Sequence, residues 1–534
     1  MKTRGLHILS VMILMGLLGM TFTVGGGGLS YMDNILWHQD SPGSPNIEGT
    51  YETLDHFGWA VASGDFNGDG IADLAVGVPH EAIGAAGFAG AVNILYGTND
   101  GLSSPGNQGW HQDSPGIEGG SEALDRFGSA LATGYFNDDQ YADLAVGVPG
   151  EDIGAINEAG AVQILYGTKN GLSATGNQMW YQDSPGIEGG SEADDRFGSA
   201  LAVGDFNDDR IDDLAVGVPG EDIGATNEAG AVHILYGTKN GLSATGNQLW
   251  DQDSLVIEGG GSQERDWFGS ALAAGNFDGD RYDDLAVGVP GEDVGAAHGA
   301  GAVNILYGGS TGLSAAANQL WHQDSPDIEG GSENFDQFGT PLAAGNFNGD
   351  RYDDLAVGVP SEAIGDTYKA GAVHILYGGV AGLSAAGDQL WSQGSPGTEG
   401  AYEAGDLFGW ALAAGNFDDD RYDDLAVGVP SEAIGAIDKA GAVHILYGTK
   451  NGLSSTGDQL WYQDSWGIED ASEDGDWFGS ALAAGNFNDD GYDDLAVGVP
   501  GEDILWRDYQ DVLMLEAGAV HILYGKGGAR VKSR

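Results

Sequence analysis

The sequence contains no cysteine, and it is poor in proline and in basic residues. Without cysteine it can form no disulfide, no zinc–thiolate site and no thiol nucleophile, and it has no cysteine to carry a lipid anchor. Only 19 Lys and Arg residues stand against 81 Asp and Glu residues, which leaves a formal net charge of −62. Binding to nucleic acid or to an anionic membrane would press like charges together, so this balance disfavours both as partners.

Long hydrophobic runs are also scarce. Residues 6–24 form an apolar run without an acidic residue, and Lys2 and Arg4 precede it. This layout is typical of a secretory signal, and we expect a signal peptide over residues 1–28, although no Ala-x-Ala motif marks the cleavage site. The alternative is a membrane anchor, which needs about 20 strongly apolar residues. No second apolar span follows. We therefore expect a secreted chain without a transmembrane segment, and cell-surface association stays open.

A repeat dominates the rest of the chain. The dipeptide Phe-Gly returns at intervals of 70 or 71 residues, with Phe at 57, 127, 197, 268, 338, 408 and 478. Four apolar, β-favouring segments follow in each copy; in the third they read FGSALAVGDF, DDLAVGVP, AGAVHILYG and QLWDQDS. Short strands bounded by Gly, Pro, Asn and Asp, with no helical period between them, are typical of a propeller blade. The sequence predicts an all-β, seven-bladed propeller with four-stranded blades.

The two ends of the repeat region complement each other. The last copy stops at Ala519–Gly525 and lacks a fourth strand, whereas an unpaired copy of that strand, Ile35–Asp40, precedes the first repeat. We expect this N-terminal strand to complete blade seven and to close the ring, which leaves no free edge for association and predicts a monomer. An open solenoid would end in atypical capping repeats instead. The predicted propeller spans 35–525, and 526–534 forms a basic tail.

These motifs resemble a known family. Phe-Gly, a Gly-Val-Pro motif and an Asp/Asn-rich loop between them are similar to the FG-GAP repeats of integrin α-subunit propellers and their prokaryotic relatives, over about residues 35–525. The resemblance implies calcium loops between the first two strands of several blades. It also implies that ligands bind on the opposite face of the propeller. No integrin-like leg domain or transmembrane helix follows Gly525, so transmembrane signalling is not expected.

The loop after the first strand has the residue types of a calcium site. Oxygen side chains at positions 1, 3, 5 and 9 and a backbone carbonyl at position 7 can wrap one hard cation, and calcium takes 6–8 such oxygens. The predicted ligands in the first three loops are Asp65, Asn67, Asp69, Ile71 and Asp73; Asn137, Asp139 and Asp143; and Asp205, Asn207, Asp209, Ile211 and Asp213. In the other four they are Asn276, Asp278, Asp280, Tyr282 and Asp284; Asn346, Asn348, Asp350, Tyr352 and Asp354; Asn416, Asp418, Asp420, Tyr422 and Asp424; and Asn486, Asn488, Asp490, Tyr492 and Asp494.

The seven loops are not equivalent. Tyr135 occupies position 1 of the second loop, so we expect up to seven calcium ions with the second site weak or empty. Position 6, where glycine turns most cheaply, carries arginine in four loops: Arg210, Arg281, Arg351 and Arg421. The alternative to a metal site is a plain Asx turn, because Asp and Asn satisfy such turns by themselves.

Other candidate groups are weaker. Four Glu-Asp pairs follow the Val-Pro motif at one repeat position, at Glu151, Glu221, Glu292 and Glu502, and we interpret them as solvated acidic loops rather than as a glycosidase pair. His233, His374, His444 and His521 share a register with Asn and Gln, which indicates a hydrogen-bonding slot. No catalytic residue is predicted.

Asymmetry points to the seventh repeat. Its loop between the second and third strands runs from Pro500 to Gly518, whereas the same loop of the third repeat runs only from Pro219 to Gly230. Apolar residues on a loop of so acidic a chain suggest a contact surface. The alternatives are that the insert folds back over its blade or plugs the ring. The predicted partner-binding residues are Leu505, Trp506, Tyr509, Leu513 and Met514.

The leading hypothesis is therefore a secreted, calcium-binding propeller, not an enzyme, that acts as an adhesion module. Its partner would be a protein or glycan of the cell surface or matrix. Two alternatives stay open: a secreted hydrolase or lyase acting on polysaccharide in the central channel, and a structural surface-layer protein. The fold alone decides none of these.

Overall fold

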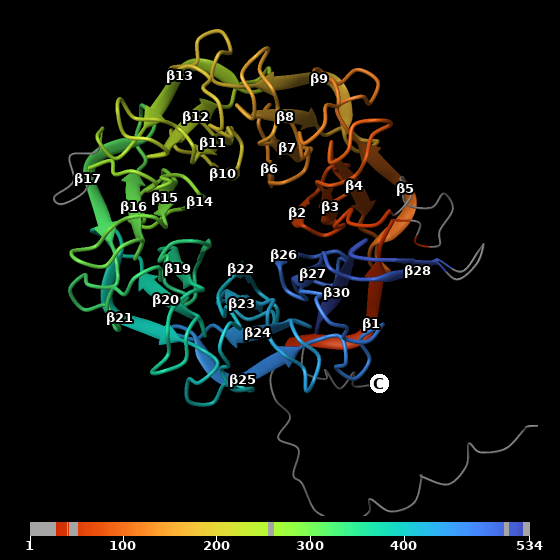
Figure 1. The fold of residues 1–534 in the computed structure, drawn as a ribbon, viewed down its shortest axis with the longest axis vertical. Helices are drawn as coiled ribbons and strands as arrows, with labels where there is room; N and C mark the ends of the chain where they lie inside the picture. The colour runs from red at the N-terminus through yellow and green to blue at the C-terminus, as the bar shows by residue number, and fades with distance from the viewer. Residues whose placement is uncertain (1–27, 40, 42–51, 255–260, 507–511, 527–534) are drawn as a thin grey trace, which may run out of the picture.

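The computed structural model describes residues 28–39, 41, 52–254, 261–506 and 512–526, without the side chains of 31–33, 505, 506, 512 and 513. The expected signal peptide lies almost wholly outside this range, and so does the basic tail beyond Lys526. Seven four-stranded antiparallel sheets stand around a central axis, as Figure 1 shows. The predicted seven-bladed, all-β propeller is confirmed. Within the described residues, no helix is long and apolar enough to cross a membrane.

Each blade is a simple meander whose four strands run from the axis outward. The innermost strands are β2 (Ala60–Gly64), β6 (Leu131–Gly134), β10 (Ala200–Gly204), β14 (Ala271–Gly275), β18 (Leu342–Gly345), β22 (Ala411–Gly415) and β26 (Ala481–Gly485). The second strands are β3 (Asp73–Val78), β7 (Asp143–Val148), β11 (Asp213–Val218), β15 (Asp284–Val289), β19 (Asp354–Val359), β23 (Asp424–Val429) and β27 (Asp494–Val499).

The outer half of each blade pairs a buried third strand with a more exposed fourth. The third strands are β4 (Ala91–Tyr96), β8 (Ala161–Tyr166), β12 (Ala231–Tyr236), β16 (Ala302–Tyr307), β20 (Ala372–Tyr377), β24 (Ala442–Tyr447) and β30 (Ala519–Lys526). The fourth strands are β5 (Ser103–Trp110), β9 (Ser173–Trp180), β13 (Ser243–Trp250), β17 (Ser314–Trp321), β21 (Ser384–Trp391), β25 (Ser454–Trp461) and β1 (Gly28–Trp37).

Blade seven joins the two ends of the chain. Its strand order is β26-β27-β30-β1, so the N-terminal strand supplies the outermost position. Trp37 pairs with Val520 and Ser30 with Tyr524, which is the register of Trp110 on Val92 and Ser103 on Tyr96 in blade one. The predicted closure is confirmed. The strand begins at Gly28 rather than at Ile35, because Gly28, Leu29 and Ser30 pair with Lys526, Gly525 and Tyr524 at the end of β30, before a register shift between Ser30 and Ile35.

The core lies between blades rather than inside one sheet. The second strand reads Asp-Leu-Ala-Val-Gly-Val in all seven copies, and every residue of it is buried. One typical apolar cluster combines Phe66 and Val92 of blade one with Phe127 and Leu144 of blade two. A strand covered on both faces favours a continuous apolar run over alternation. The near-continuous apolar character of these segments therefore reflects the stacking of blades.

The Phe-Gly dipeptide makes the closest contact between blades. Phe127 is fully buried and forms a bridge to Gly90 at the start of the preceding blade's third strand. Gly128, at φ +92°, brings its carbonyl oxygen so near Gly77 that a Cβ there would lie 2.1 Å from it. Glycine is needed at 128 for the positive φ and at 77 for the close approach of the carbonyl oxygen. The repeat signature is thus the residue pair that lets neighbouring blades touch.

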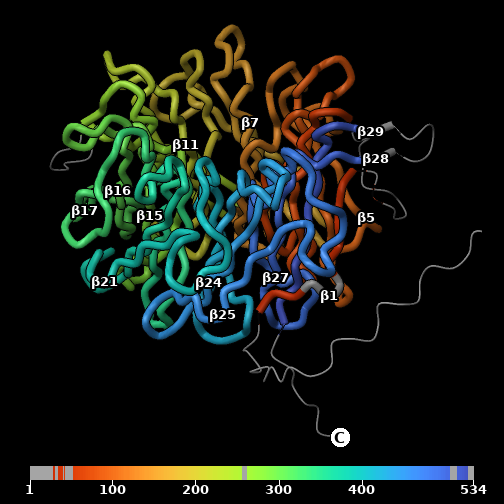
Figure 2. Tube along the Cα trace, turned by 60° about the horizontal axis from the view of Figure 1, so that its bottom comes forward, coloured from red at the N-terminus to blue at the C-terminus, as the bar shows by residue number. Residues whose placement is uncertain are grey.

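Because successive strands of a blade are antiparallel, successive loops lie on opposite faces of the propeller. Loops between first and second strands lie on one face, which we call the Asx-loop face. Loops between second and third strands, and those leading to the next blade, lie on the other. That face also carries the two-stranded hairpin of β28 (Ile504–Trp506) and β29 (Val512–Met514), and we call it the hairpin face. Figures 1 and 2 show the hairpin projecting outward from blade seven.

Candidate metal centres and ligand face

The ninth position of every Asx loop is the first residue of a second strand. These seven aspartates are at most 1% exposed: Asp73, Asp143, Asp213, Asp284, Asp354, Asp424 and Asp494. In blade one, Asp73 Oδ2 accepts the N–H of Phe66 at 3.0 Å and Oδ1 accepts that of Gly97 at 2.9 Å. The equivalent two bonds recur in the other six blades. Each carboxylate thus ties its loop to the next turn and still has free lone pairs.

Burial perturbs these aspartates strongly. Loss of water raises the pKa of Asp73 to about 8, and the nearby charges of Asp65 and Asp69 add to the effect. The other six ninth-position aspartates have a pKa of about 8 for the same main reason. A buried carboxylate beside like charges needs a proton or a cation near neutral pH. The loops therefore favour bound positive charge.

The remaining loop oxygens form the expected turns. Asp65 accepts the N–H groups of Gly68, Asp69 and Gly70 at 2.7–3.1 Å. The side chains at positions 3 and 5 accept the N–H groups two residues on, from Asp69 and Ile71. The Asx-turn hydrogen bonds considered as the alternative are thus present. They do not rule out a metal, because each carboxylate or carbonyl oxygen can accept more than one partner.

The fourth and fifth loops contain oxygens that lack a donor. Asn276 and Asn346, both at position 1, donate Nδ2 to the carbonyls of Asp280 and Asp350, at 3.0 and 2.8 Å. Their Oδ1 atoms are buried and accept no hydrogen bond from any residue that the structure describes. A buried acceptor without a partner is costly. Among the described residues, no three His, Asp or Glu side chains cluster closely enough to hold a metal by themselves. These loops would hold a calcium ion only if Asn and backbone oxygens joined the carboxylates.

Loop differences follow the sequence. Tyr135 is 41% exposed, and its N–H donates to Asp212 of the next blade at 2.8 Å, so position 1 of the second loop offers no side-chain carboxylate or amide. Arg351 stacks on the ring of Tyr352, with the guanidinium 4.9 Å from the ring centroid, and Arg281 pairs with Asp208 of the preceding loop at 3.3 Å. Arg281 is thus held by a residue outside the predicted ligands, and Arg351 by the ring of Tyr352, whose backbone carbonyl is the predicted ligand.

One interpretation of the hairpin face is wrong. The glutamates of the Glu-Asp pairs are not solvated, because Glu151, Glu221, Glu292 and Glu502 are at most 8% exposed. Each accepts a hydrogen bond from a glutamine of the preceding blade, as Gln112 donates to Glu151. Glu81, Glu362 and Glu432 do the same with Gln39, Gln323 and Gln393. The sequence does contain a sign of this contact. In all seven copies, a glutamine stands two residues after the tryptophan that ends the fourth strand.

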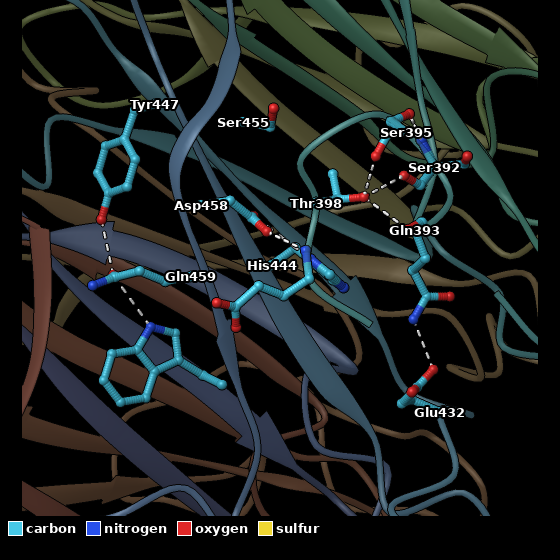
Figure 3. Close-up of polar contacts among 12 residues, drawn as sticks. Ser392, Gln393, Ser395, Thr398, Glu432, His444, Tyr447, Ser455, Asp458 and Gln459 are labelled. Atoms are coloured by element: carbon cyan, nitrogen blue, oxygen red, sulfur yellow. Dashed lines mark hydrogen bonds and ion pairs between the residues drawn. The ribbon is translucent and has the colours of Figure 1, made fainter. Parts of the chain in front are cut away.

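The histidine register is an interior slot, as expected. His233, His374, His444 and His521 are fully buried. His374 Nδ1 lies 3.3 Å from Asp388, and Gln163 in the same register donates to Asn177 at 2.7 Å. His444 faces Asp458 at 3.7 Å, as Figure 3 shows. The rings of His233 and His521 have no hydrogen-bond partner in the described part of the chain, so the slot serves packing as well as polar contact.

The predicted partner residues lie in or beside the hairpin. Leu505 pairs with Leu513 across β28 and β29, and Trp506 ends β28. Tyr509 lies outside the described residues. Met514 is half-buried, next to Ile504 at the hairpin base, and its sulfur accepts the hydroxyl of Thr53 at 3.9 Å. None of the described residues of the insert lines the central channel.

An aromatic cluster stands beside the hairpin base, at the junction of blades seven and one. The His56 ring lies 4.7 Å from His80 and 5.8 Å from Trp59, and Phe88 packs on His80 at 4.8 Å. Burial lowers the pKa of both imidazoles, that of His80 to about 4, so both are neutral at physiological pH. Trp59 is 44% and Phe88 37% exposed. The sequence gives no periodic signal for this cluster, because its members depart from the repeat consensus at different positions of the first repeat.

The FG-GAP repeat model matches residues 57–95, 127–165, 197–235, 268–306, 338–376, 408–446 and 478–523, together more than half of the chain. The chain belongs to the FG-GAP repeat family. The matched segments of this FG-GAP propeller begin with the Phe-Gly pair that forms its blade interfaces.

Individual relatives cover only part of this propeller. Human phosphatidylinositol-glycan-specific phospholipase D is 31% identical over 47% of the chain and 28% of its own length. Chicken integrin alpha-V is 34% identical and Xenopus laevis integrin alpha-5 31% identical, each over 45% of the chain and 20% of its own length. The chain spans less than a third of these relatives.

Proposed function

We propose that this FG-GAP propeller is a secreted, calcium-stabilised binding module for a protein or glycan of the cell surface or matrix. Calcium would occupy the Asx loops, up to seven in number, and the hairpin face would engage the partner. The cluster of His56, Trp59, His80 and Phe88 beside the β28–β29 hairpin carries the proposal. It breaks the seven-fold repetition on the face opposite the Asx loops.

Calcium would have a structural role. Each loop links the first strand of its blade to a buried aspartate on the second strand, at a point where the backbone of the neighbouring blade is hydrogen-bonded. Ala142 N–H donates to the carbonyl of Asp65 in the preceding blade at 2.9 Å, for example. A cation on Asp65 would therefore stiffen a blade junction as well as a loop. A site filled at 100 times its dissociation constant adds up to about 2.7 kcal/mol of stability.

The aromatic cluster is suited to binding. Trp and neutral His rings supply rigid contact area at low entropic cost, and such residues dominate interface energies. Glu516 lies 3.4 Å from His56 Nε2 at the edge of the cluster. An apolar centre with an acidic rim matches the usual anatomy of an interface.

We further infer that the propeller is not an enzyme. The central channel, with a volume of about 290 Å³, is lined in each blade by apolar residues of the first strand and its start: Trp59, Ala60, Val61, Ala130, Leu131, Ala200, Leu201, Ala271, Leu272, Pro341, Leu342, Ala411, Leu412, Ala481 and Leu482. None of these side chains can serve as an acid, base or nucleophile. The polysaccharide hydrolase or lyase and the surface-layer protein remain the alternatives.

The chain offers a matched test. Trp59 and Trp410 follow the Phe-Gly dipeptides of blades one and six and are 44% and 45% exposed. Binding of the purified mature protein to a glycan array and to immobilised matrix proteins would identify ligands. Trp59→Ala should then weaken binding about tenfold or more, the loss expected at an interface hot spot, whereas Trp410→Ala should not. Equal effects of the two variants would contradict the proposed surface. Turnover of polysaccharide substrates would instead support the enzyme alternative.

A further inference from the structure

Seven buried polar clusters repeat around the hairpin face, and none belongs to the Asx loops. Each combines a glutamine that follows the fourth strand of one blade with an aspartate and a glutamate of the next blade. The seven trios are Gln39/Asp55/Glu81, Gln112/Asp125/Glu151, Gln182/Asp195/Glu221, Gln252/Asp266/Glu292, Gln323/Asp336/Glu362, Gln393/Asp406/Glu432 and Gln463/Asp476/Glu502. All 21 side chains are at most 8% exposed. The set is complete in every copy, whereas the Asx loops lose their first ligand at Tyr135.

The three side chains of a cluster lie against one another. Gln39 Nε2 donates to Glu81 Oε2 at 2.7 Å, and Figure 3 shows the amide of Gln393 directed at the carboxylate of Glu432 in the same way. Asp406 and Glu432 lie close enough for each carboxyl group to perturb the pKa of the other. Gln39 and Glu81 also line a common cavity of about 180 Å³ together with Trp110. Space for a small ligand therefore exists beside the cluster.

Every cluster has more acceptors than donors. The glutamine gives one N–H to the glutamate, and the aspartate Oδ2 takes a backbone N–H three residues upstream, as Asp266 does from Gln263. In all seven clusters the Oε1 atom of the glutamine is buried and has no hydrogen-bond partner among the described residues. The same holds for Oδ1 of Asp125, Asp195 and Asp266. Each glutamine is at most 2% exposed, and its orphan oxygen belongs to the same amide group whose nitrogen donates to the glutamate.

Two carboxylates and an amide oxygen are the donor set of a hard cation. Calcium accepts such oxygens in flexible geometry and completes its shell with water, and it would satisfy acceptors that no described donor reaches. We propose that the hairpin face holds a second ring of up to seven calcium sites, one at each blade junction, formed by these Gln/Asp/Glu trios. Because the glutamine comes from one blade and the carboxylates from the next, each ion would join two blades.

Equilibrium dialysis against calcium tests the proposal on the folded mature chain. Seven Asx loops plus seven trios set an upper limit of fourteen ions, and we expect more than seven. The variant Glu221→Gln/Glu292→Gln/Glu432→Gln should lose three ions. Its matched control, Asp209→Asn/Asp280→Asn/Asp420→Asn, alters the Asx loops of the same three blades and should lose three different ones. If only the glutamine variant changes the count, the trios bind calcium and the Asx loops do not.

An unchanged calcium count in the glutamine variant would overturn the proposal. A second measurement needs no variant. Terbium in place of calcium should emit when only tryptophan is excited, because Trp110 lines the cavity with Gln39 and Glu81. The Asx loops carry tyrosine rather than tryptophan. Terbium bound without tryptophan-sensitised emission would count equally against the second ring.

Discussion

Removal of calcium should make the propeller sensitive to alkali. The seven ninth-position aspartates have a pKa of about 8 in the folded chain, against 3.8 as the reference value. An acid whose pKa is raised by folding binds more protons in the folded state than in the unfolded state. Its protonation supports the fold at low pH, and that support is lost as pH rises from about 4 to about 8. The clustered glutamates, with pKa values of about 7 to about 9, act in the same direction.

The effect is large relative to ordinary stability. A rise of roughly four pKa units at one buried aspartate corresponds to at most about 5–6 kcal/mol. Whole domains have a net stability of about 5–15 kcal/mol, so seven such charges cannot all be ionised without compensation. Unfolding entropy of about 2.1 cal/mol/K per residue, over roughly 480 ordered residues, gives about 1 kcal/mol per degree. One uncompensated loop would then lower Tm by roughly 5 °C.

Calorimetry at pH 5 and pH 8, each with chelator and with millimolar calcium, measures this directly. With chelator, Tm should be lower at pH 8 by several degrees or more. Calcium should raise Tm more at pH 8 than at pH 5, because protons occupy the carboxyl groups at the lower pH. A Tm in chelator that stays level or rises between pH 5 and pH 8 would refute the reasoning, and so would an equal calcium effect at both.

Three further outcomes follow from the geometry. Gly77→Ala should lower stability by about 1–3 kcal/mol or more in denaturant unfolding, because its Cβ meets a neighbouring carbonyl at 2.1 Å, whereas Gly87→Ala, with open space around it, should not. Tyr135→Asp should add one bound calcium ion in titration calorimetry, and Tyr135→Phe should add none. Deletion of Gly28–Trp37 should expose the edge of β30 and produce aggregates in size-exclusion chromatography. A synthetic peptide of that strand should restore the monomer, and a monomeric deletion variant without peptide would contradict the role of β1.

The periodic features of the propeller could be predicted from the sequence. Identical Asp-Leu-Ala-Val-Gly-Val segments at a constant interval imply identical strands, and an unpaired strand at each end implies closure. The aspartate at loop position 9 could be placed because it is also the first residue of the second strand. The N-terminal boundary could not, since Gly28 and Leu29 pair only because β30 extends to Lys526, beyond the tyrosine at which the other third strands end.

The hairpin face was harder to predict because its chemistry depends on contacts between repeats. Glu151 looks like any acidic loop residue until Gln112 of the preceding blade covers it. The cluster of His56, Trp59, His80 and Phe88 is also invisible in a repeat alignment, since each residue departs from the consensus at a different position. A repeat pattern reveals the residues that all copies have in common, whereas this cluster is made of residues of the first repeat that the other copies do not all share.

Closure by the N-terminal strand also means that blade seven can be completed only after the whole propeller has been synthesised. Translation proceeds at about 5–20 residues per second, so β1 waits tens of seconds before its partner β30 is made. During that wait, the third strands of six other blades offer almost the same sequence and the same register as β30. Each of those blades carries its own fourth strand within a few residues of the third, so its edge is covered locally and early. The short loops between third and fourth strands thus protect the chain against mispairing and strand exchange while β1 is still unpaired.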